Sequence, residues 1–234
     1  MERYQPTLLP DFVDLAKRTP SELFPPSCRC NEVPEGQGEP LEPAEEFILS
    51  PQAAPAVRSL FKAGRSAARR GLAQLGLPSQ AILRNEDRSP AWPKGIVGSI
   101  THTQGCAIAV VAHSSKVQGL GIDIELLDRK VSLNLVEKFA IPHEAEWVSA
   151  STDDEDQRWR LLRLLSAKEA TFKTFYPLEK VYLGFLDVEL TVNKNGFSGV
   201  LHQSCSTDWQ VGASFDVLQS VWNRYLVSTC WIST

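Results

Sequence analysis

Residues 121–125 of this 234-residue chain read Gly-Ile-Asp-Ile-Glu, and this alternation of apolar and acidic side chains constrains the fold more than any other feature. Neighbouring side chains of a β-strand point to opposite faces, so Ile122 and Ile124 share one face while Asp123 and Glu125 share the other. Two carboxylates side by side on one face repel each other unless a cation lies between them. The pattern predicts a strand with one apolar face and one face suited to a cation.

A second acidic motif follows in a segment with helical periodicity. Residues 166–170 read Ser-Ala-Lys-Glu-Ala, and Glu169 lies 44 residues after Glu125 (169 − 125). Glu169 is four residues before Lys173 and therefore on the same helix face. Three carboxylates with a few waters suit Mg²⁺, which completes its coordination with substrate phosphates. Lysines beside such a site would hold phosphate.

Each motif also has a simpler interpretation. Alternating polar residues are common on the solvated face of an edge strand. Glu–Lys pairs four residues apart are common on helix surfaces, where each contributes only about 0.3–0.5 kcal/mol. Gly119, Gly121 and the apolar run 107–111 favour a central strand over an exposed edge. The presence of both motifs in one chain favours the metal interpretation.

Together the two motifs resemble those of the 4′-phosphopantetheinyl transferases, enzymes that move phosphopantetheine from coenzyme A to a serine of a carrier protein. Three further segments resemble the enterobactin synthase component D branch of that family. The first is residues 92–102, which begin with Trp-Pro and end with Ser-Ile-Thr-His. The second is residues 64–76, which begin with Gly-Arg, and the third is Leu-Leu-Pro at residues 8–10. The resemblance covers most of the chain. One departure is Leu165, where the family usually has an aromatic residue before the serine.

The resemblance implies a role for each candidate residue. The carboxylates would bind Mg²⁺, the lysines would reach the phosphates of coenzyme A, and other polar side chains would hold its 3′-phosphate side. The implied metal ligands are Asp123, Glu125 and Glu169, and Lys168 and Glu169 are also implied in catalysis. The implied coenzyme A ligands are Arg58, Arg65, Arg84, Ser99, His102, Lys168 and Lys173.

The resemblance also implies a base that removes the proton of the acceptor serine. Glu144, which lies 19 residues after Glu125 (144 − 125), is the candidate, and Glu146 or a metal-bound water are alternatives. The implied reaction is attack of the serine on the β-phosphorus of coenzyme A, with release of adenosine 3′,5′-bisphosphate. The rival hypotheses are a Mg²⁺-dependent nucleotide phosphohydrolase and a non-catalytic relative that binds coenzyme A or the carrier.

The composition limits the kinds of binding partner and cellular location that we expect. The net charge of −4 argues against nucleic acid, because its binding normally needs a basic surface. The five cysteines lack zinc spacing, so we expect free thiols. We see no signal-peptide pattern and no apolar run long enough to span a membrane. We therefore expect a cytoplasmic monomer that acts on acyl, peptidyl or aryl carrier proteins.

Carrier proteins of this type are acidic around their serine-bearing helix, so the docking surface should combine basic and apolar side chains. The segment after the strand motif fits that description. Its candidate contacts are Arg129, Lys130, Val131, Leu135, Lys138 and Phe139.

The periodicity of the whole chain predicts an α+β fold in which helices pack on antiparallel sheets. We expect an N-terminal subdomain over 1–116, with a surface loop at 20–45, and a C-terminal subdomain over 117–234. The resemblance implies that these subdomains are pseudo-symmetric and that the active site lies in the cleft between them. The predicted helices are 57–75, 133–140, 143–150 and one that begins at 153–156 and ends at Pro177. The predicted strands are 97–101, 106–113, 117–125, 185–192, 199–203, 209–215 and 224–231.

Overall fold

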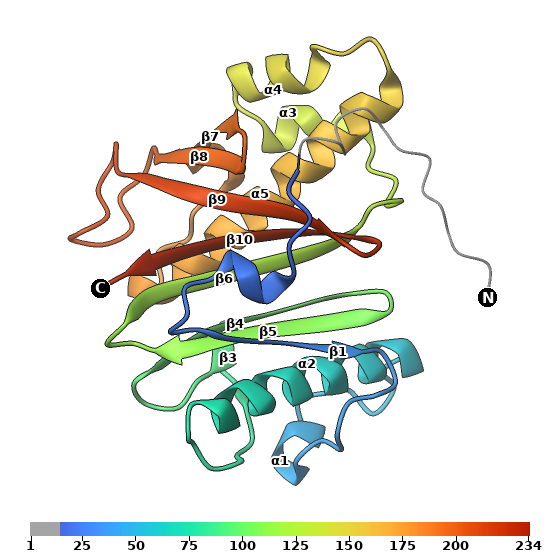
Figure 1. The fold of residues 1–234 in the computed structure, drawn as a ribbon, viewed down its shortest axis with the longest axis vertical. Coiled ribbons are helices and arrows are strands. Elements are labelled where there is room, and N and C mark those ends of the chain that lie inside the picture. Colours follow the sequence, from blue (N-terminus) through green and yellow to red (C-terminus); the bar gives the residue numbers. More distant parts are fainter. Residues whose placement is uncertain (1–14) are drawn as a thin grey trace.

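The computed structural model describes residues 15–234, so the predicted match at 8–10 lies outside the described residues. Two antiparallel sheets lie side by side, and each is covered by one long helix (Figure 1). Helix α2 (Pro55–Gln74) packs on the smaller sheet, and helix α5 (Asp154–Glu179) packs on the larger one. The predicted α+β fold, with helices packed on antiparallel sheets, is confirmed.

The smaller sheet has three strands, built from residues 29–113. Its order is β1 (Arg29–Pro34), β5 (Cys106–His113) and β4 (Ile96–Thr103). The central strand β5 is buried along nearly all its length, because both of its faces are covered. Its odd-numbered apolar residues pack with α2, whereas its even-numbered residues pack with side chains of β6.

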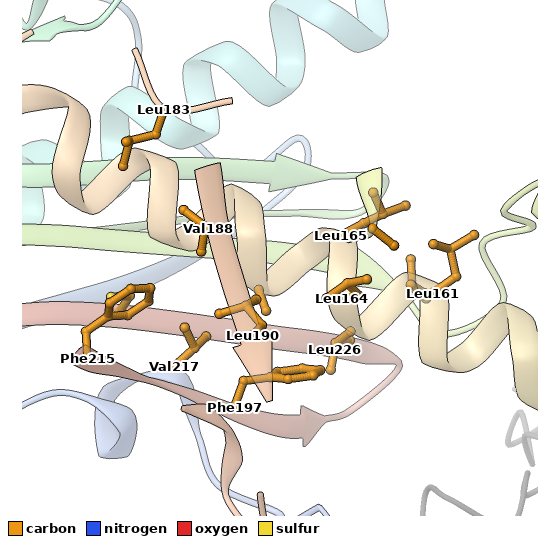
Figure 2. Close-up of a cluster of buried hydrophobic side chains, with 14 of the residues drawn as sticks. Leu161, Leu164, Leu165, Leu183, Val188, Leu190, Phe197, Phe215, Val217 and Leu226 are labelled. Carbon is orange, nitrogen blue, oxygen red and sulfur yellow. The ribbon is translucent and has the colours of Figure 1, made fainter. Parts of the chain in front are cut away.

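The larger sheet has five strands, built from residues 117–233. Its order is β6 (Val117–Leu126), β10 (Tyr225–Ser233), β9 (Ser214–Trp222), β8 (Gly196–Leu201) and β7 (Val188–Asn193). Leucines of α5 meet apolar side chains from these strands in one cluster, including Leu164, Leu190, Phe197, Val217 and Leu226 (Figure 2). Burial of each such side chain contributes about 1.5–3 kcal/mol, so this contact fixes α5 on its sheet.

Short elements connect these layers. They are the 3₁₀ helices η2 (Pro20–Leu23), η3 (Leu133–Leu135) and η4 (Phe185–Asp187), the helices α1 (Pro43–Glu46), α3 (Val136–Phe139) and α4 (Pro142–Ser149), and the strands β2 (Leu83–Arg84) and β3 (Pro90–Ala91). Strands β2 and β3 pair as a hairpin whose loop spans residues 85–89. This hairpin belongs to neither large sheet.

The protein has a smaller half, which is the three-stranded sheet with α2, and a larger half, which is the five-stranded sheet with α5. Strand β6 lies at the seam between these two halves. It is an edge strand of its own sheet, which corrects the predicted central position. It is nevertheless buried, because β4 runs beside its open edge and the amide of Ile122 donates to Ser99 Oγ at 3.2 Å. Ile122 and Ile124 pack into the cluster between the sheets, and Asp123 points the other way, toward α5. The predicted division of faces is therefore confirmed.

Four predicted elements differ from the structure. The strand predicted at 185–192 begins only at Val188, because residues 185–187 form the 3₁₀ helix η4. The segment 20–45 is not only a loop, because it contains the edge strand β1, in which Val33 alone is buried. The strand predicted at 209–215 is wrong, since β9 begins at Ser214 after a turn. Helix α5 continues through Pro177 to Glu179, because a proline near a helix end removes only one backbone hydrogen bond.

The described residues include five free cysteines, of which Cys30 alone is partly exposed. No helix within residues 15–234 combines the length and the apolar character needed to cross a membrane.

Candidate active site

Asp123 is the centre of the candidate site, and this residue is 6% exposed. Oδ1 accepts hydrogen bonds from Lys173 Nζ at 2.7 Å and from Thr101 Oγ1 at 3.3 Å. Oδ2 accepts one from Ser166 Oγ at 2.9 Å. These contacts join β4, β6 and α5, so one carboxylate connects both halves of the protein.

Two glycines allow α5 to approach β6 closely enough for these bonds. A Cβ atom on Gly121 would lie 1.9 Å from the carbonyl oxygen of Ala170, and one on Gly119 would lie 2.6 Å from that of Thr174. Real Cβ atoms do not approach backbone oxygens this closely, so any side chain at either position would push the helix away. The glycines that precede Asp123 therefore place it against α5.

The two other predicted metal ligands, Glu125 and Glu169, lie in the electrostatic neighbourhood of Asp123. Burial and the charge of Asp123 raise the pKa of Glu125 to about 7, and Arg129, its hydrogen-bond partner, opposes the shift. Burial also raises the pKa of Glu169, where Lys173 opposes the shift. Acidic side chains with raised pKa values are groups that a nearby cation would stabilise. Within residues 15–234, no three histidine, cysteine or acidic side chains already converge as a metal-binding group.

Glu144 and Lys168 form a buried ion pair. Their side chains are 0% and 1% exposed, and Lys168 Nζ lies 2.6 Å from Glu144 Oε2. Lys168 also donates to the carbonyl oxygens of Phe185 (2.6 Å) and Val188 (3.0 Å). Burial lowers the pKa of Lys168, and the charge of Glu144 opposes that shift. The pair ties the middle of α5 to the start of β7.

Both oxygens of Glu144 are engaged. Oε2 accepts from the amide of Ile141 as well as from Lys168, and Oε1 accepts from the amide of Leu190 at 2.8 Å. A general base needs an open oxygen near its proton donor, so this geometry does not support Glu144 in that role. Glu146, the predicted alternative, is exposed on α4.

Two of the predicted coenzyme A arginines, Arg65 and Arg84, form a basic region on the smaller half. Arg65 is 6% exposed, stacks over the ring of Phe61, and has no hydrogen-bond partner for its Nε among the described residues. Burial lowers the pKa of Arg65 to about 10, and the nearby charges of Arg84 and Arg69 add to the shift. Arg58 lies apart in an ion pair with Glu46 at 2.6 Å. The charge of Glu45 opposes the shift in the pKa of Arg65, so Arg65 lies among charges of both signs, and its guanidinium can still hold an anion.

Ser99 and His102 have separate surroundings on β4. Ser99 is buried and accepts the Ile122 amide, so in this structure it joins the two sheets. His102 is an exposed residue, and the partial burial of its ring, together with the charge of Lys173, lowers its pKa.

A cavity of about 560 Å³ lies next to Lys173, between the two halves. Its walls come from β4, the start of β6, the β2–β3 hairpin and one face of α5, which supplies Phe172, Lys173 and Tyr176. This volume is typical of a site for a small ligand. A second cavity of about 130 Å³ borders Lys168 and Glu169, and the rings of Phe172 and Tyr182 line both cavities.

Two contacts of the site were missed in the sequence. Thr101 and Ser166 both lie inside recognised motifs, but only the fold shows that their hydroxyl groups bind Asp123. Glu45, with no exposed area, was also missed: it pairs with Arg69 and accepts the amide of Ile82 at 2.9 Å. A glutamate in a Pro/Glu-rich segment gives no sequence signal for such burial.

Fold and site together define an α+β protein with acidic groups, cationic groups and a ligand-sized cavity at the seam of two halves. Comparison with known sequences identifies the family. Residues 44–112 match the 4′-phosphopantetheinyl transferase N-terminal domain, and residues 119–230 match the 4′-phosphopantetheinyl transferase superfamily.

Named relatives agree with these matches. The chain is 33% identical over 198 residues to the 4′-phosphopantetheinyl transferase Npt of Nocardia iowensis, covering 82% of this chain and 86% of Npt. It is 35% identical over 157 residues to the 4′-phosphopantetheinyl transferase PptT of Mycobacterium tuberculosis, covering 66% of this chain and 68% of PptT. Enterobactin synthase component D of Salmonella typhimurium is 33% identical over 126 residues, which are 53% of this chain and 47% of that protein. The chain belongs to the 4′-phosphopantetheinyl transferase family, which confirms the resemblance seen in its motifs.

Proposed function

We propose that this protein transfers 4′-phosphopantetheine from coenzyme A to a serine of an apo carrier protein. Family membership supports the class of reaction. The single structural observation that carries the proposal is the Asp123 cluster at the seam, where Lys173 lies between an acidic site and a ligand-sized cavity. That arrangement suits a substrate with phosphates at one end and a long arm at the other.

We propose Mg²⁺ as the cofactor, held by Asp123, Glu125 and Glu169. The donor set fits, because Mg²⁺ prefers carboxylate oxygens and is bound by a few of them together with substrate phosphates. Arg129 and Lys173 now neutralise two of these groups, and their movement toward phosphate would free those carboxylates for the ion. Bound there, Mg²⁺ would stabilise negative charge on the pyrophosphate.

The chemical step is a displacement at phosphorus. The serine oxygen of the carrier forms a bond to the β-phosphorus of coenzyme A, the bond from that phosphorus to the bridging oxygen breaks, and adenosine 3′,5′-bisphosphate leaves. Lys173, at the mouth of the cavity, would hold the phosphates and neutralise charge on the leaving group. The protein contributes mainly orientation and charge, since no bond to the enzyme is needed.

We assign the serine proton to an acceptor other than Glu144, because both oxygens of Glu144 accept hydrogen bonds in this structure. We assign this role to Glu169, because it is only partly buried and one of its two carboxylate oxygens would stay available when the other binds the ion. We assign Glu144 and Lys168 to positioning, since their buried pair holds α5 against β7. The positioning role of Glu144 and Lys168 departs from the catalytic roles that the resemblance implies, whereas a catalytic role for Glu169 agrees with it.

The 3′-phosphate of coenzyme A would bind in the basic region. Arg65 is the strongest candidate, because its buried guanidinium has an unpartnered Nε beside Arg84. His102 would add a third donor. Arg58 would join them only after release from Glu46.

The carrier would dock near the start of the larger half. Of the predicted contacts, Val131 is buried and unavailable, and Phe139 packs edge-on against Phe185. Lys130 and Lys138 are exposed and remain candidates for the acidic carrier. Carriers of siderophore or other nonribosomal peptide synthesis, and of polyketide synthesis, are the expected partners.

Incubation with coenzyme A, Mg²⁺ and a panel of apo carriers tests the proposal, read as the mass gain of the carrier. Transfer should require the metal and should stop on chelation. Asp123→Asn should abolish transfer, whereas Asp216→Asn, on the remote strand β9, should not. Transfer at full rate by Asp123→Asn would refute the site, and Arg65→Met should weaken coenzyme A binding more than dephospho-coenzyme A binding.

A further inference from the structure

A row of buried polar side chains crosses the larger sheet beneath α5. Strands β6, β10 and β9 are neighbours in that sheet (Figure 1), and Asp123, Ser228 and Gln219 lie directly opposite one another on them. Opposed residues of paired strands share one face of a sheet, and Asp123 points from this face toward α5. The row therefore lies in the layer between the sheet and the helix, where a cluster of apolar side chains surrounds it.

Two residues of α5 join this row into one hydrogen-bonded chain. Ser166 Oγ lies 2.9 Å from Asp123 Oδ2 and 2.8 Å from Ser228 Oγ. Gln219 Nε2 donates to Ser228 Oγ at 2.9 Å and to the carbonyl oxygen of Arg163 at 2.9 Å. Gln219 Oε1 accepts from Arg163 Nε at 3.0 Å. The chain therefore runs without a break from Asp123 to Arg163, and all of its residues are buried.

The far end of the chain has a fixed position. Gln219 uses both ends of its amide group, so a rotation of this group would break its hydrogen bonds to Arg163. The guanidinium carbon of Arg163 also lies 5.6 Å from the ring centre of Trp147 and 5.4 Å from that of Phe197. A fully hydrogen-bonded network of buried groups favours one arrangement of its members. The groups behind Ser228 therefore fix its hydroxyl, and with it the hydroxyl that contacts Asp123.

The two oxygens of Asp123 have different surroundings. Oδ2 faces the chain, in the interior of the larger half. Oδ1 faces Lys173 and Thr101 at the seam, and Lys173 lines the 560 Å³ cavity. The side chain of Lys173 is 25% exposed and can move toward a ligand, whereas the chain behind Oδ2 is closed to solvent. A carboxylate held in this way by one oxygen presents the other oxygen in a fixed direction.

The cost of such a chain points to a role beyond packing. Apolar side chains would fill the same layer without polar groups that must each find a partner. Hydrogen bonds to a carboxylate that binds a metal ion orient it and tune its affinity for the ion.

We infer that Ser166 and Ser228, anchored by Gln219, are positioning residues that aim Oδ1 of Asp123 at the metal ion. This inference rests on the proposed function, in which Asp123 binds Mg²⁺. Each of these residues acts through Asp123, and the nearest of them to the ion contacts only the oxygen that faces the interior.

The test measures metal affinity directly. The probe is Mn²⁺ alone, because it prefers the same oxygen ligands as Mg²⁺, and calorimetry gives its dissociation constant for each variant. Loss of a hydrogen bond to a metal ligand typically costs about 10–100-fold in affinity. We therefore expect Ser166→Ala to weaken Mn²⁺ binding by about ten-fold, and Ser228→Ala, one step further along the chain, by at least about three-fold.

Thr229→Val is the matched control. Thr229 follows Ser228 on β10, points to the opposite face of the sheet and is equally buried. Its Oγ1 has no hydrogen-bond partner among the described residues. Valine has nearly the same shape, so this variant removes a buried hydroxyl that lies outside the chain. Its dissociation constant for Mn²⁺ should equal that of wild type.

Transfer activity gives a second measurement, which a general loss of folding would not reproduce. Excess Mg²⁺ should restore kcat of Ser228→Ala to the wild-type value, while the Mg²⁺ concentration at half-maximal rate stays raised. A variant whose fold is damaged would keep a low kcat at any metal concentration, and that result would count against a positioning role.

Two results would overturn the inference. One is a dissociation constant for Mn²⁺ that stays within about two-fold of wild type in both Ser166→Ala and Ser228→Ala. The other is an equal weakening in Thr229→Val, because the effect would then not depend on the chain.

Failure of the proposed function would look different. Absence of transfer to every apo carrier would refute that function, and the Mn²⁺ measurement would still test the chain. If Asp123→Asn binds Mn²⁺ as tightly as wild type, the metal assignment is wrong, and urea unfolding of Ser228→Ala, Asp123→Asn and the double variant then tests the chain without metal. Losses that do not add would support the orientation of Asp123 by Ser228, and losses that add would overturn it.

Discussion

Replacement of Lys168 by Met tests whether this lysine is a positioning residue or touches the substrate. The lysine is 2% exposed and donates to three acceptors, the Glu144 carboxylate and the carbonyls of Phe185 and Val188. Removal of one partner from a buried pair leaves an uncompensated charge and typically costs about 3–5 kcal/mol. Glu144 keeps two amide donors, at Ile141 and Leu190, which places the expected loss at the lower end of that range.

The measurement is urea unfolding of wild type, Lys168→Met and the double variant Glu144→Gln/Lys168→Met. A domain of this kind has only about 5–15 kcal/mol of total stability, so a loss of about 3 kcal/mol is readily measured. The double variant removes both charges, and its glutamine can still accept the Leu190 amide. We expect it to recover about 2 kcal/mol of the loss, because no buried charge is left unpaired.

Transfer activity separates the two roles. If Lys168 acts by positioning, activity per folded molecule should return in part in the double variant. If Lys168 holds phosphate directly, activity should stay absent in both variants. The reasoning is refuted if Lys168→Met unfolds within about 1 kcal/mol of wild type yet has lost transfer, since the buried pair would then be irrelevant to stability.

Three further outcomes are expected. Gly121→Ala would place a methyl group 1.9 Å from the Ala170 carbonyl oxygen, so α5 must move by about 1 Å to reach a 3.0 Å contact. We expect this variant to lose about 1–3 kcal/mol of unfolding free energy in urea and to lose transfer. Gly64→Ala, whose closest contact would be the Ile100 side chain at 3.0 Å and not a backbone oxygen, should keep both. Leu164→Ala, in the core of the larger half, should lower unfolding free energy by about 2–5 kcal/mol with activity per folded molecule unchanged. Burial lowers the pKa of His102, so the ring gains its positive charge only as the pH falls. When the pH is lowered from about 7.5 to about 5.5, the preference of wild type for coenzyme A over dephospho-coenzyme A should therefore increase. The preference of His102→Ala should not increase over the same range.

Much of the fold was predictable because its periodicities are strong. Strand β5 was predicted with its observed bounds, 106–113, since an unbroken apolar run between two turns has few alternatives. Strand β1 was missed because an edge strand needs little apolar surface, and its proline and charged residues resemble those of a loop. Strand β9 was displaced because the turn at 209–213 contains Trp209 and Val211, which fit a strand pattern as well as a loop.

The acidic motifs of the site were predictable from the sequence, but the contacts and the burial of its individual side chains were not. The two motifs, together with the family resemblance that they carry, indicated that Asp123 and Lys173 belong to one site, and the structure places Lys173 Nζ 2.7 Å from Asp123 Oδ1. Spacing could not show that Lys168 points to Glu144, because a helix presents adjacent residues about 100° apart and the packing decides which one is buried. The burial of Glu144 depends on β7, more than 40 residues away in sequence, and no local pattern encodes it.

The register between β6 and α5 explains why the two motifs carry these particular residues. Gly119, Gly121 and Asp123 are two residues apart on one strand face, a repeat of about 6.6 Å. Their partners on α5 are Thr174, Ala170 and Ser166, four residues apart, a repeat of about 6.0 Å. The two repeats nearly match, so a helix that runs antiparallel to the strand can stay in contact over three successive positions.

Small residues at the first two positions bring the backbones together, and the third position can then carry a carboxylate that reaches the helix. A shift of one residue in the strand would turn Asp123 toward the apolar cluster between the sheets. The glycines that appear to belong only to packing therefore determine where the acidic group lies.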